Sequence, residues 1–375
     1  MTEELHTNPE YPIELPYRRV LDHGFVALVE VMGSDSSIVQ AARVSYGKGT
    51  KTVRSDKALI SYLARHRHTT PTEMIEFKFL MRLPVFIARQ VVRHRTASLN
   101  EYSGRYSIVP DRFWVPDLGA IADQDEVNRQ GRMDMIRKLA DALPERSAAC
   151  AHVANQKAAL VAEDGTGISR VALREPAYRA AFLKHWRADA STDMLPSQEH
   201  VFWVEQLLEF HPETKARFER IRDAYREQNE RSYAMYQGLM KDGVAREIAR
   251  SILPLSMYTE WYWKMDLHNL FHFLKLRMDP HAQLEVRAFA EATATFVKEH
   301  CPMAWESFEK DVLHGVWLSS DERATLRPGD DAAQRRVLET LYERGYRARR
   351  LKEVCRKLDI DETIVDELWP KKPKA

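Results

Sequence analysis

Side chains that bind anions and planar polar rings gather in one fifteen-residue stretch, residues 93–107. The stretch holds three arginines, one histidine, one carboxylate and three serines, and Gly104 opens the backbone among them. Guanidinium groups pair with phosphates and with carboxylate or imide edges, while serine hydroxyls add short-range hydrogen bonds. The stretch therefore has the functional groups of a nucleotide-binding site. Each arginine taken alone is also compatible with a solvated helix end.

The elements around this stretch explain how it would be positioned. Apolar residues alternate with polar ones over 75–83, which predicts a half-buried strand. Pro84 then opens a short apolar-periodic run to Val92, so a short helix should end at or just before Arg93. The basic triplet Arg93, His94 and Arg95 thus falls where cations favour the negative end of a helix.

Other segments predict a mixed α/β fold. Residues 25–32 are typical of a buried strand, and 37–43 of a short helix. Asp56 is expected to N-cap a helix that runs to Arg67, where polar residues 68–73 interrupt it. Further along, residues 258–265 predict a strand, and Asp266 is expected to N-cap a helix ending at Arg277. Helices are also predicted over 125–143, through 225–239 to a cap at Asp242-Gly243, over 246–253, and after 279–283.

Composition limits the possible functions. The 56 basic and 55 acidic residues nearly cancel, so no overall field points to nucleic acid or a membrane, and small anions are the expected ligands. No 18-residue apolar run and no signal-peptide pattern is present, which predicts a cytoplasmic protein. Three widely spaced cysteines, Cys150, Cys301 and Cys355, favour reduced thiols over disulfides or a zinc site.

The motif itself resembles a known family. Arg93-His94-Arg95, seven residues and then Ser103 match the RHR-x7-S pattern of flavin-dependent thymidylate synthases, and Asn100-Glu101 and Ser103–Tyr106 extend the match. Residues 246–254 resemble the second motif of that family. The similarity covers roughly residues 20–116 and 221–312. It implies an α/β (α+β) fold with a central antiparallel sheet flanked by long helices.

The resemblance implies roles for individual residues. FAD would be bound by Thr70, Arg93, His94, Arg95, Glu101, Asp266, Leu267, His268 and His272. The substrate dUMP would be bound by Gln90, Arg93, Glu101, Tyr102, Ser103, Gly104, Arg105, Arg250 and Arg277. Arg277 would polarise the base and His68 would lie near flavin and folate; both, with Ser103, are the expected catalytic residues.

The implied reaction converts dUMP to dTMP, with methylenetetrahydrofolate as one-carbon donor and NADPH as hydride source through FAD. It needs no cysteine nucleophile, and an arginine against the uracil edge would stabilise negative charge on the ring. The resemblance also implies a homotetramer with active sites between subunits. Asp266 stands where the family usually has Asn, which removes an amide donor to the cofactor, and Thr72 replaces a usual Phe, which is expected to widen that wall of the pocket.

Several alternatives stay open. Ser103 has no recognisable His-Asp partners, so a hydrogen-bonding role is favoured over a nucleophilic one. His268 and His272 lack a third metal ligand, so a metal site is not favoured. Residues 117–213 are interpreted as a helical insertion in a domain 1–318, and residues 319–375 as a helical packing appendage resembling a helix-turn-helix unit. Residues 163–167 are expected to form a turn, and the basic residues over 170–187 a solvated face or a ligand patch. A binding-only relative and a nucleic-acid-binding protein are the competing functions.

Overall fold

The computed structural model describes residues 14–44, 53–126, 131–142, 195–315, 331–343, 346, 348–358, 360–361 and 363–369. The chain separates into two compact units, residues 1–313 and 314–375. The turn expected at 163–167, the basic residues over 170–187 and Cys150 lie outside the described residues. In the described part of the chain, no helix combines the length and the apolar character needed to cross a membrane.

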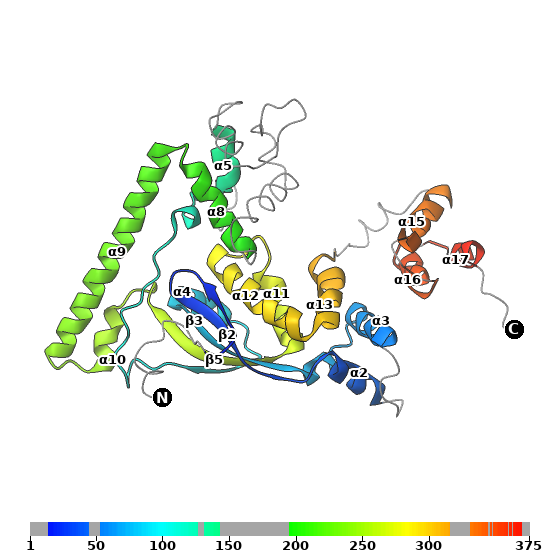
Figure 1. The fold of residues 1–375 in the computed structure, drawn as a ribbon, viewed down its shortest axis with the longest axis horizontal. Coiled ribbons are helices and arrows are strands. Elements are labelled where there is room, and N and C mark those ends of the chain that lie inside the picture. Colours follow the sequence, from blue (N-terminus) through cyan, green and yellow to red (C-terminus); the bar gives the residue numbers. More distant parts are fainter. Residues whose placement is uncertain are drawn as a thin grey trace. The chain divides into compact units, whose positions relative to one another are not determined.

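A five-stranded antiparallel sheet organises the first unit, which confirms the predicted fold class (Figure 1). The strand order is β1-β2-β3-β5-β4. β3 and β5, which lie far apart in the sequence, are therefore neighbours in the sheet. The strands are β1 (Tyr17–Val20), β2 (Gly24–Met32), β3 (Glu76–Pro84), β4 (Ser98–Glu101) and β5 (Tyr258–Asp266). The predicted strands at 25–32, 75–83 and 258–265 are confirmed within a residue or two.

Helices cover one face of the sheet, where alternate strand residues are buried (Figure 1). Phe77, Phe79 and Met81 of β3 and Trp261 and Trp263 of β5 point into this core, as the two-residue period of a strand requires. The helices are α2 (Asp35–Arg43), α3 (Val53–Arg65), α4 (Val85–Val91), α5 (Met135–Ala142), α8 (Pro196–Leu208), α9 (Pro212–Lys241), α10 (Arg246–Ala249), α11 (Leu267–Arg277), α12 (Leu284–His300) and α13 (Pro302–Phe308). Short 3-10 turns are η2 (Thr72–Met74), η3 (Leu118–Ala120) and η5 (Arg250–Ile252), and Glu309–Leu313 is a π-helical turn.

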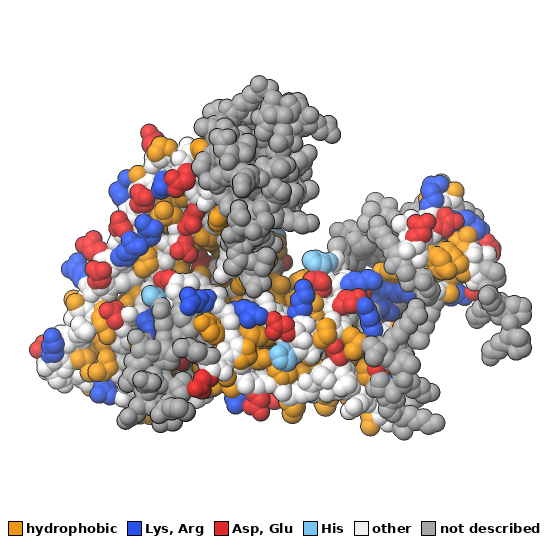
Figure 2. Space-filling view, in the orientation of Figure 1, with side chains coloured by type: hydrophobic (Ala, Val, Ile, Leu, Met, Phe, Trp, Pro, Cys, Tyr) orange, Lys and Arg blue, Asp and Glu red, His pale blue; other side chains and the backbone are white. Residues whose placement is uncertain are grey.

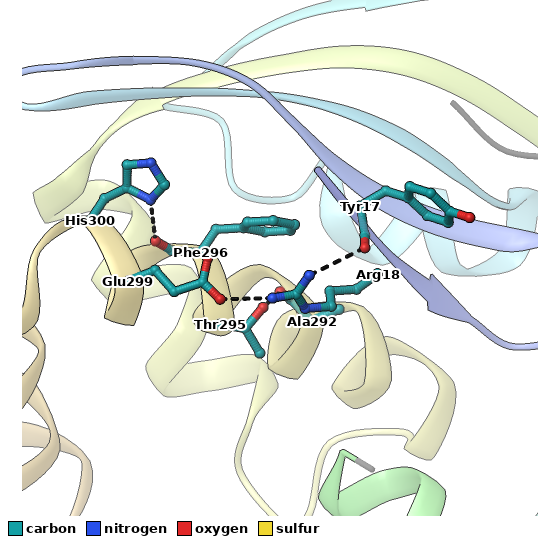
Figure 3. A network of polar contacts seen from close by, with 7 residues as sticks. All are labelled: Tyr17, Arg18, Ala292, Thr295, Phe296, Glu299 and His300. Atoms are coloured by element: carbon teal, nitrogen blue, oxygen red, sulfur yellow. Dashed lines mark hydrogen bonds and ion pairs between the residues drawn. The ribbon is translucent and has the colours of Figure 1, made fainter. Parts of the chain in front are cut away.

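Polar contacts attach helix α12, which covers the sheet, to strand β1 and to helix α8. Arg18 of β1 pairs with Glu299 at 2.7 Å and lies over the Phe296 ring, as the close view in Figure 3 shows. On the same helix, buried Glu291 accepts hydrogen bonds from the backbone N–H and the hydroxyl of Ser197, at 2.9 and 2.6 Å. Glu291 therefore satisfies donors at the first turn of α8.

Two predicted helix starts are wrong. Asp56 does not N-cap α3, which begins at Val53; its buried carboxylate pairs instead with Arg43 at 2.8 Å. The helix expected from Asp125 begins only at Met135, because Gln124 and Arg132 before it are paired in a β-bridge. Two other predicted helix boundaries are confirmed. Gly243, with φ of +78°, follows the C-terminus of α9. Asp266 N-caps α11, and its carboxylate accepts from the Asn269 backbone N–H.

The second unit has its own small core. Its helices are α15 (Asp331–Glu343), α16 (Ala348–Leu358) and α17 (Thr363–Leu368). They bury Leu338, Leu351, Cys355 and Val365 among themselves. Helical structure in this segment confirms the helical pattern predicted there. Opposite charges alternate over the visible surface of both units in Figure 2, in line with the near-zero net charge.

Candidate active site

The second half of the central motif is an edge strand followed by a tight turn. Glu101 of β4 pairs with Trp261 of β5, and the backbone N–H of Tyr102 donates to the Glu260 carbonyl at 2.8 Å. The chain then turns back, since the N–H of Tyr106 donates to the Ser103 carbonyl at 3.1 Å. β4 is four exposed residues long, which is why no alternating pattern predicted it.

A cavity of about 320 Å³ opens beside this turn. It brings together five of the predicted substrate-binding residues, Glu101 to Gly104 and Arg250, from distant parts of the sequence. Its lining consists of Val85, Glu101, Tyr102, Ser103, Gly104, Val109, Arg250, Met257, Tyr258 and Thr259. Apolar walls with a few convergent polar groups are typical of a small-molecule site.

Gly104 gives Arg250 the space to reach this cavity. A Cβ atom added at Gly104 would lie 3.0 Å from Val109 Cγ2 and 3.2 Å from Arg250 Cδ, tighter than ordinary contacts. The Arg250 side chain makes no hydrogen bond or ion pair with any described residue. An arginine held in a cavity without a protein partner is suited to an anionic ligand.

Arg105 does not line the cavity. Its guanidinium pairs with Glu247 of α10 at 3.2 Å, with both side chains more than half exposed. Arg246 on the same helix donates to the Tyr106 carbonyl. These two contacts fasten the turn 103–107 to α10, so Arg105 here acts on the shape of the turn.

Arg277 belongs to a second group of predicted residues. Its Nε donates to His94 Nε2 at 3.1 Å and its Nη2 donates to the Gln90 carbonyl at 3.1 Å. His272, one turn earlier on α11, lies 5.8 Å from the His94 ring. Within the described part of the chain, no hydrogen bond, ion pair or ring contact joins this group to the residues of the cavity.

His94 is held as a neutral imidazole. Burial first, and then the positive charge of Arg277 and the neighbouring His272, lower the pKa of His94 to about 4. Because Nε2 accepts from Arg277, the ring proton is on Nδ1. Burial also lowers the pKa of Arg277 from its usual value. His94 therefore orients Arg277 without adding charge.

Arg93 and Arg95 lie directly after α4, as predicted from the apolar run that ends at Val92. Both side chains are exposed and have no partner among the described residues. Two free guanidinium groups at a helix end fit the pyrophosphate of a dinucleotide such as FAD. The donor set present therefore fits the cofactor that the sequence motif implies.

Most of the remaining predicted cofactor residues lie on α11 or cap it. The backbone N–H of buried Leu267 donates to the Ile75 carbonyl just after η2, and His268 is half-buried. Exposed Thr70 precedes η2, and its carbonyl accepts from the Glu73 N–H at 3.2 Å. Asp266 uses both carboxylate oxygens on Asn269, at 2.9 Å to its N–H and 2.6 Å to its side-chain amide. His68 is exposed, and its described ring contacts are with Tyr62 and His66, at centroid distances of 6.1 and 6.4 Å.

The described cysteines are unsuited to nucleophilic attack. Cys301 and Cys355 are buried free thiols, and burial raises the pKa of Cys301 to about 12. A thiolate nucleophile needs an accessible, cationic setting that lowers the pKa. Among the described residues no cluster of histidine, cysteine or carboxylate side chains could hold a metal ion.

Comparison with known proteins identifies the family. The family model described as thymidylate synthase complementing protein matches residues 27–174 and 184–303. The chain belongs to the flavin-dependent thymidylate synthase family. It is 41% identical over 318 residues to the flavin-dependent thymidylate synthase of Thermus thermophilus, covering 85% of this chain and 86% of that one.

Other relatives agree. The flavin-dependent thymidylate synthase of Treponema denticola is 40% identical, with 82% of this chain and 88% of the relative covered. That of Rickettsia prowazekii is 41% identical over 80% of this chain and 81% of the relative. Among solved structures, the chain is similar to a UMP/dUMP methylase PolB from Streptomyces cacaoi, 26% identical with a TM-score of 0.49 over 77% of this chain and 96% of that chain.

The family match also covers most of the segment that we interpreted as an insertion, since it extends through residues 117–174 and resumes at 184. Five cavity residues lie outside the sequence motifs: Val85, Val109, Met257, Tyr258 and Thr259. Tyr258 and Thr259 were predicted only as the start of an aromatic strand. Their place in the cavity depends on the pairing of β5 with β4, which the sequence alone does not specify.

Proposed function

We propose that this protein is a flavin-dependent thymidylate synthase that converts dUMP to dTMP, using FAD, NADPH and methylenetetrahydrofolate. Two findings support the proposal: membership of the family and the cavity that gathers Glu101, Ser103, Gly104 and Arg250. The single observation that carries the site assignment is Arg250, whose side chain lies in this cavity without a partner among the described residues.

The substrate would bind in this cavity through its phosphate. Arg250 supplies a guanidinium, and Ser103 supplies a hydroxyl next to the closely packed backbone of Gly104. Charge-assisted contacts of this kind favour a dianionic phosphate over a neutral nucleoside. Apolar Val85, Val109 and Met257 would exclude water from the rest of the nucleotide.

Arg277 would stabilise the uracil ring as negative charge develops on it. Its orientation is fixed by two contacts, with neutral His94 and the Gln90 carbonyl, so the planar fork is already ordered before substrate binds. A preorganised cation in a partly dry site stabilises charge that appears only in the transition state. Ser103 then serves binding and needs no nucleophilic role.

FAD, when bound, supplies the hydride that NADPH provides. Arg93 and Arg95 would bind its pyrophosphate, because both are exposed and without partners in the described structure. His268 and His272 lie one turn apart on α11 and would border the flavin. Asp266 would contribute mainly by capping α11, since both of its carboxylate oxygens are engaged there.

We also propose a homotetramer with active sites between subunits. Among the described residues no hydrogen bond, ion pair or ring contact joins the Arg277 group to the Arg250 cavity, and one nucleotide needs both the base contact and the phosphate contact. A second copy of the chain would supply the missing group. A cytoplasmic location stays a prediction from the sequence.

The test is an absorbance spectrum of the purified protein followed by turnover. We expect bound FAD, NADPH oxidation that depends on dUMP, and dTMP formation that depends on methylenetetrahydrofolate. A protein that binds FAD and dUMP but makes no dTMP would contradict catalysis and leave a binding-only relative. A protein that binds neither ligand would contradict the whole proposal.

A further inference from the structure

Thr259 lies where the core face of β5 reaches the nucleotide cavity. Trp261 and Trp263 follow it at two-residue spacing and are each 1% exposed in the core, so Thr259 points to the same face. Its own side chain is 6% exposed and lines the cavity. A buried hydroxyl at the end of an apolar row needs a hydrogen-bond partner.

The partner is the carboxylate of Glu101. Thr259 Oγ1 donates to Glu101 Oε1 at 2.6 Å, across 158 residues of sequence. The sheet register explains the meeting, because Glu101 pairs with Trp261 and so shares the face of Trp261 and Thr259. An ionised carboxylate only accepts hydrogen bonds, so the hydroxyl is the donor.

Glu101 and Arg250 line the same cavity with opposite charges, yet no ion pair joins them among the contacts of the described residues. Glu101 is exposed and has no described partner other than Thr259. The stiff, β-branched Thr259 side chain therefore determines where this carboxylate lies. A carboxylate released from Thr259 could approach the guanidinium of Arg250 and compete with a phosphate for it.

We infer that Thr259 is a positioning residue that holds the Glu101 carboxylate away from Arg250, so that Arg250 stays available to the substrate phosphate. The inference rests on the proposed function, because it assumes that dUMP occupies this cavity. Glu101 Oε2 receives no hydrogen bond from the described residues, so it is ready to accept one from the nucleotide.

The experiment measures dUMP affinity of the FAD-loaded protein by titration calorimetry. Thr259→Val keeps the branched shape but removes the donor, and should weaken dUMP binding about tenfold, the scale of one hydrogen bond to a charged group. Thr259→Ser restores the hydroxyl and should stay within roughly twofold of wild type by the same reasoning. FAD affinity should not change in either variant.

A double-mutant cycle separates this role from a purely structural one. In a Glu101→Gln background the carboxylate charge is gone, so adding Thr259→Val should weaken dUMP binding no further. The same loss from Thr259→Val in both backgrounds would overturn the inference. So would an unchanged affinity of Thr259→Val in the wild-type background.

A matched control removes another buried hydroxyl. Thr293 of α12 is 0% exposed and donates to the Phe289 carbonyl at 2.8 Å. Thr293→Val should leave dUMP affinity unchanged, and an equal loss in this variant would show a general effect of the fold and overturn the role of Thr259. Wild-type protein that binds no dUMP would overturn the proposed function itself, whereas normal wild-type binding with an unaffected Thr259→Val overturns only this inference.

Discussion

Arg250 and Arg277 differ in what already holds them, and that difference predicts different kinetics. Arg250 has no described protein partner, so its contact with a phosphate exists before any chemistry. Arg277 is fixed by His94 and Gln90 and would act on charge that grows during the reaction. Ground-state contacts govern KM, while contacts that strengthen in the transition state govern the chemical rate.

We therefore predict that Arg250→Ala mainly raises the KM for dUMP, while Arg277→Ala slows single-turnover methylene transfer at saturating dUMP. Loss of one ionic stabiliser, about 3 kcal/mol, lowers the rate on the order of a hundredfold. Arg277→Lys should recover only part of this rate, because a point charge cannot make both of the contacts of Arg277. A normal saturated rate in Arg277→Ala would assign Arg277 to binding alone.

His94 makes the stability of the protein depend on pH. Its pKa is near 6.5 in an unfolded chain and about 4 in the fold, mainly because of burial and then Arg277. Between these values the unfolded state binds more protons, so this contribution to stability is complete above pH 6.5 and is lost as the pH falls toward 4. The protein should therefore be less stable at pH 5 than at pH 7.

The test compares wild type with His94→Gln, which keeps an acceptor for Arg277 but does not titrate. Denaturant unfolding at pH 7 and pH 5 should show a smaller loss of stability for the variant than for wild type. Parallel losses in the two proteins would show that His94 does not bind fewer protons in the folded state.

The sequence predicted which residues belong to the candidate site better than it predicted which contacts they make. Arg93, Arg95 and Ser103 stood out from the polar stretch 93–107, and Arg250 was implied by the resemblance to the family. The contact between Arg277 and His94 was not predicted, because it joins residues 183 positions apart and depends on how α11 packs beside α4. Asp56 illustrates the same limit, since a good N-cap residue is used instead in a buried ion pair.

At the scale of elements, long periodic segments were predictable and short exposed ones were not. β3 and β5 bury alternate residues over part of their length, and β2 buries a continuous run at its start, so their patterns are strong. β4 exposes all four of its residues and exists because β5 offers it an edge. The cavity forms at this edge, so its lining could be predicted only in part.

Two glycines in different elements allow a matched prediction. Gly104→Ala would place a Cβ atom 3.2 Å from Arg250 Cδ and 3.0 Å from Val109, so Arg250 must shift and dUMP binding should weaken roughly tenfold, like the loss of a charged contact. Gly238→Ala in α9 meets nothing within 4 Å.

Gly238→Ala should instead stabilise the protein by about 0.5–1 kcal/mol, as alanine does in an open helix interior. Thermal unfolding and dUMP titration of both variants provide the measurement. Weaker dUMP binding in both would point to a general effect of added methyl groups. Unchanged binding in Gly104→Ala would show that Arg250 does not depend on the space beside Gly104.

At the scale of the molecule, the two compact units have separate cores. The apolar cluster around the sheet draws on residues up to Leu313, whereas the C-terminal cluster of Leu338, Leu351 and Val365 packs only within its own helices. Every residue assigned to substrate or FAD belongs to the first unit. The sequence predicted a boundary at 318, because the chain departs from the resemblance to the family from about Ser319.

We therefore predict that a chain ending at residue 318 folds, binds FAD and turns over dUMP at close to the full-length rate. No described residue after Leu313 belongs to the apolar cluster around the sheet, so the truncated chain keeps every described member of that cluster. Steady-state turnover and thermal unfolding of the truncated and full-length proteins test this. A truncated protein that keeps its unfolding temperature but loses turnover would assign the C-terminal helices a part in catalysis or assembly. One that fails to fold would show that the first unit depends on them for stability.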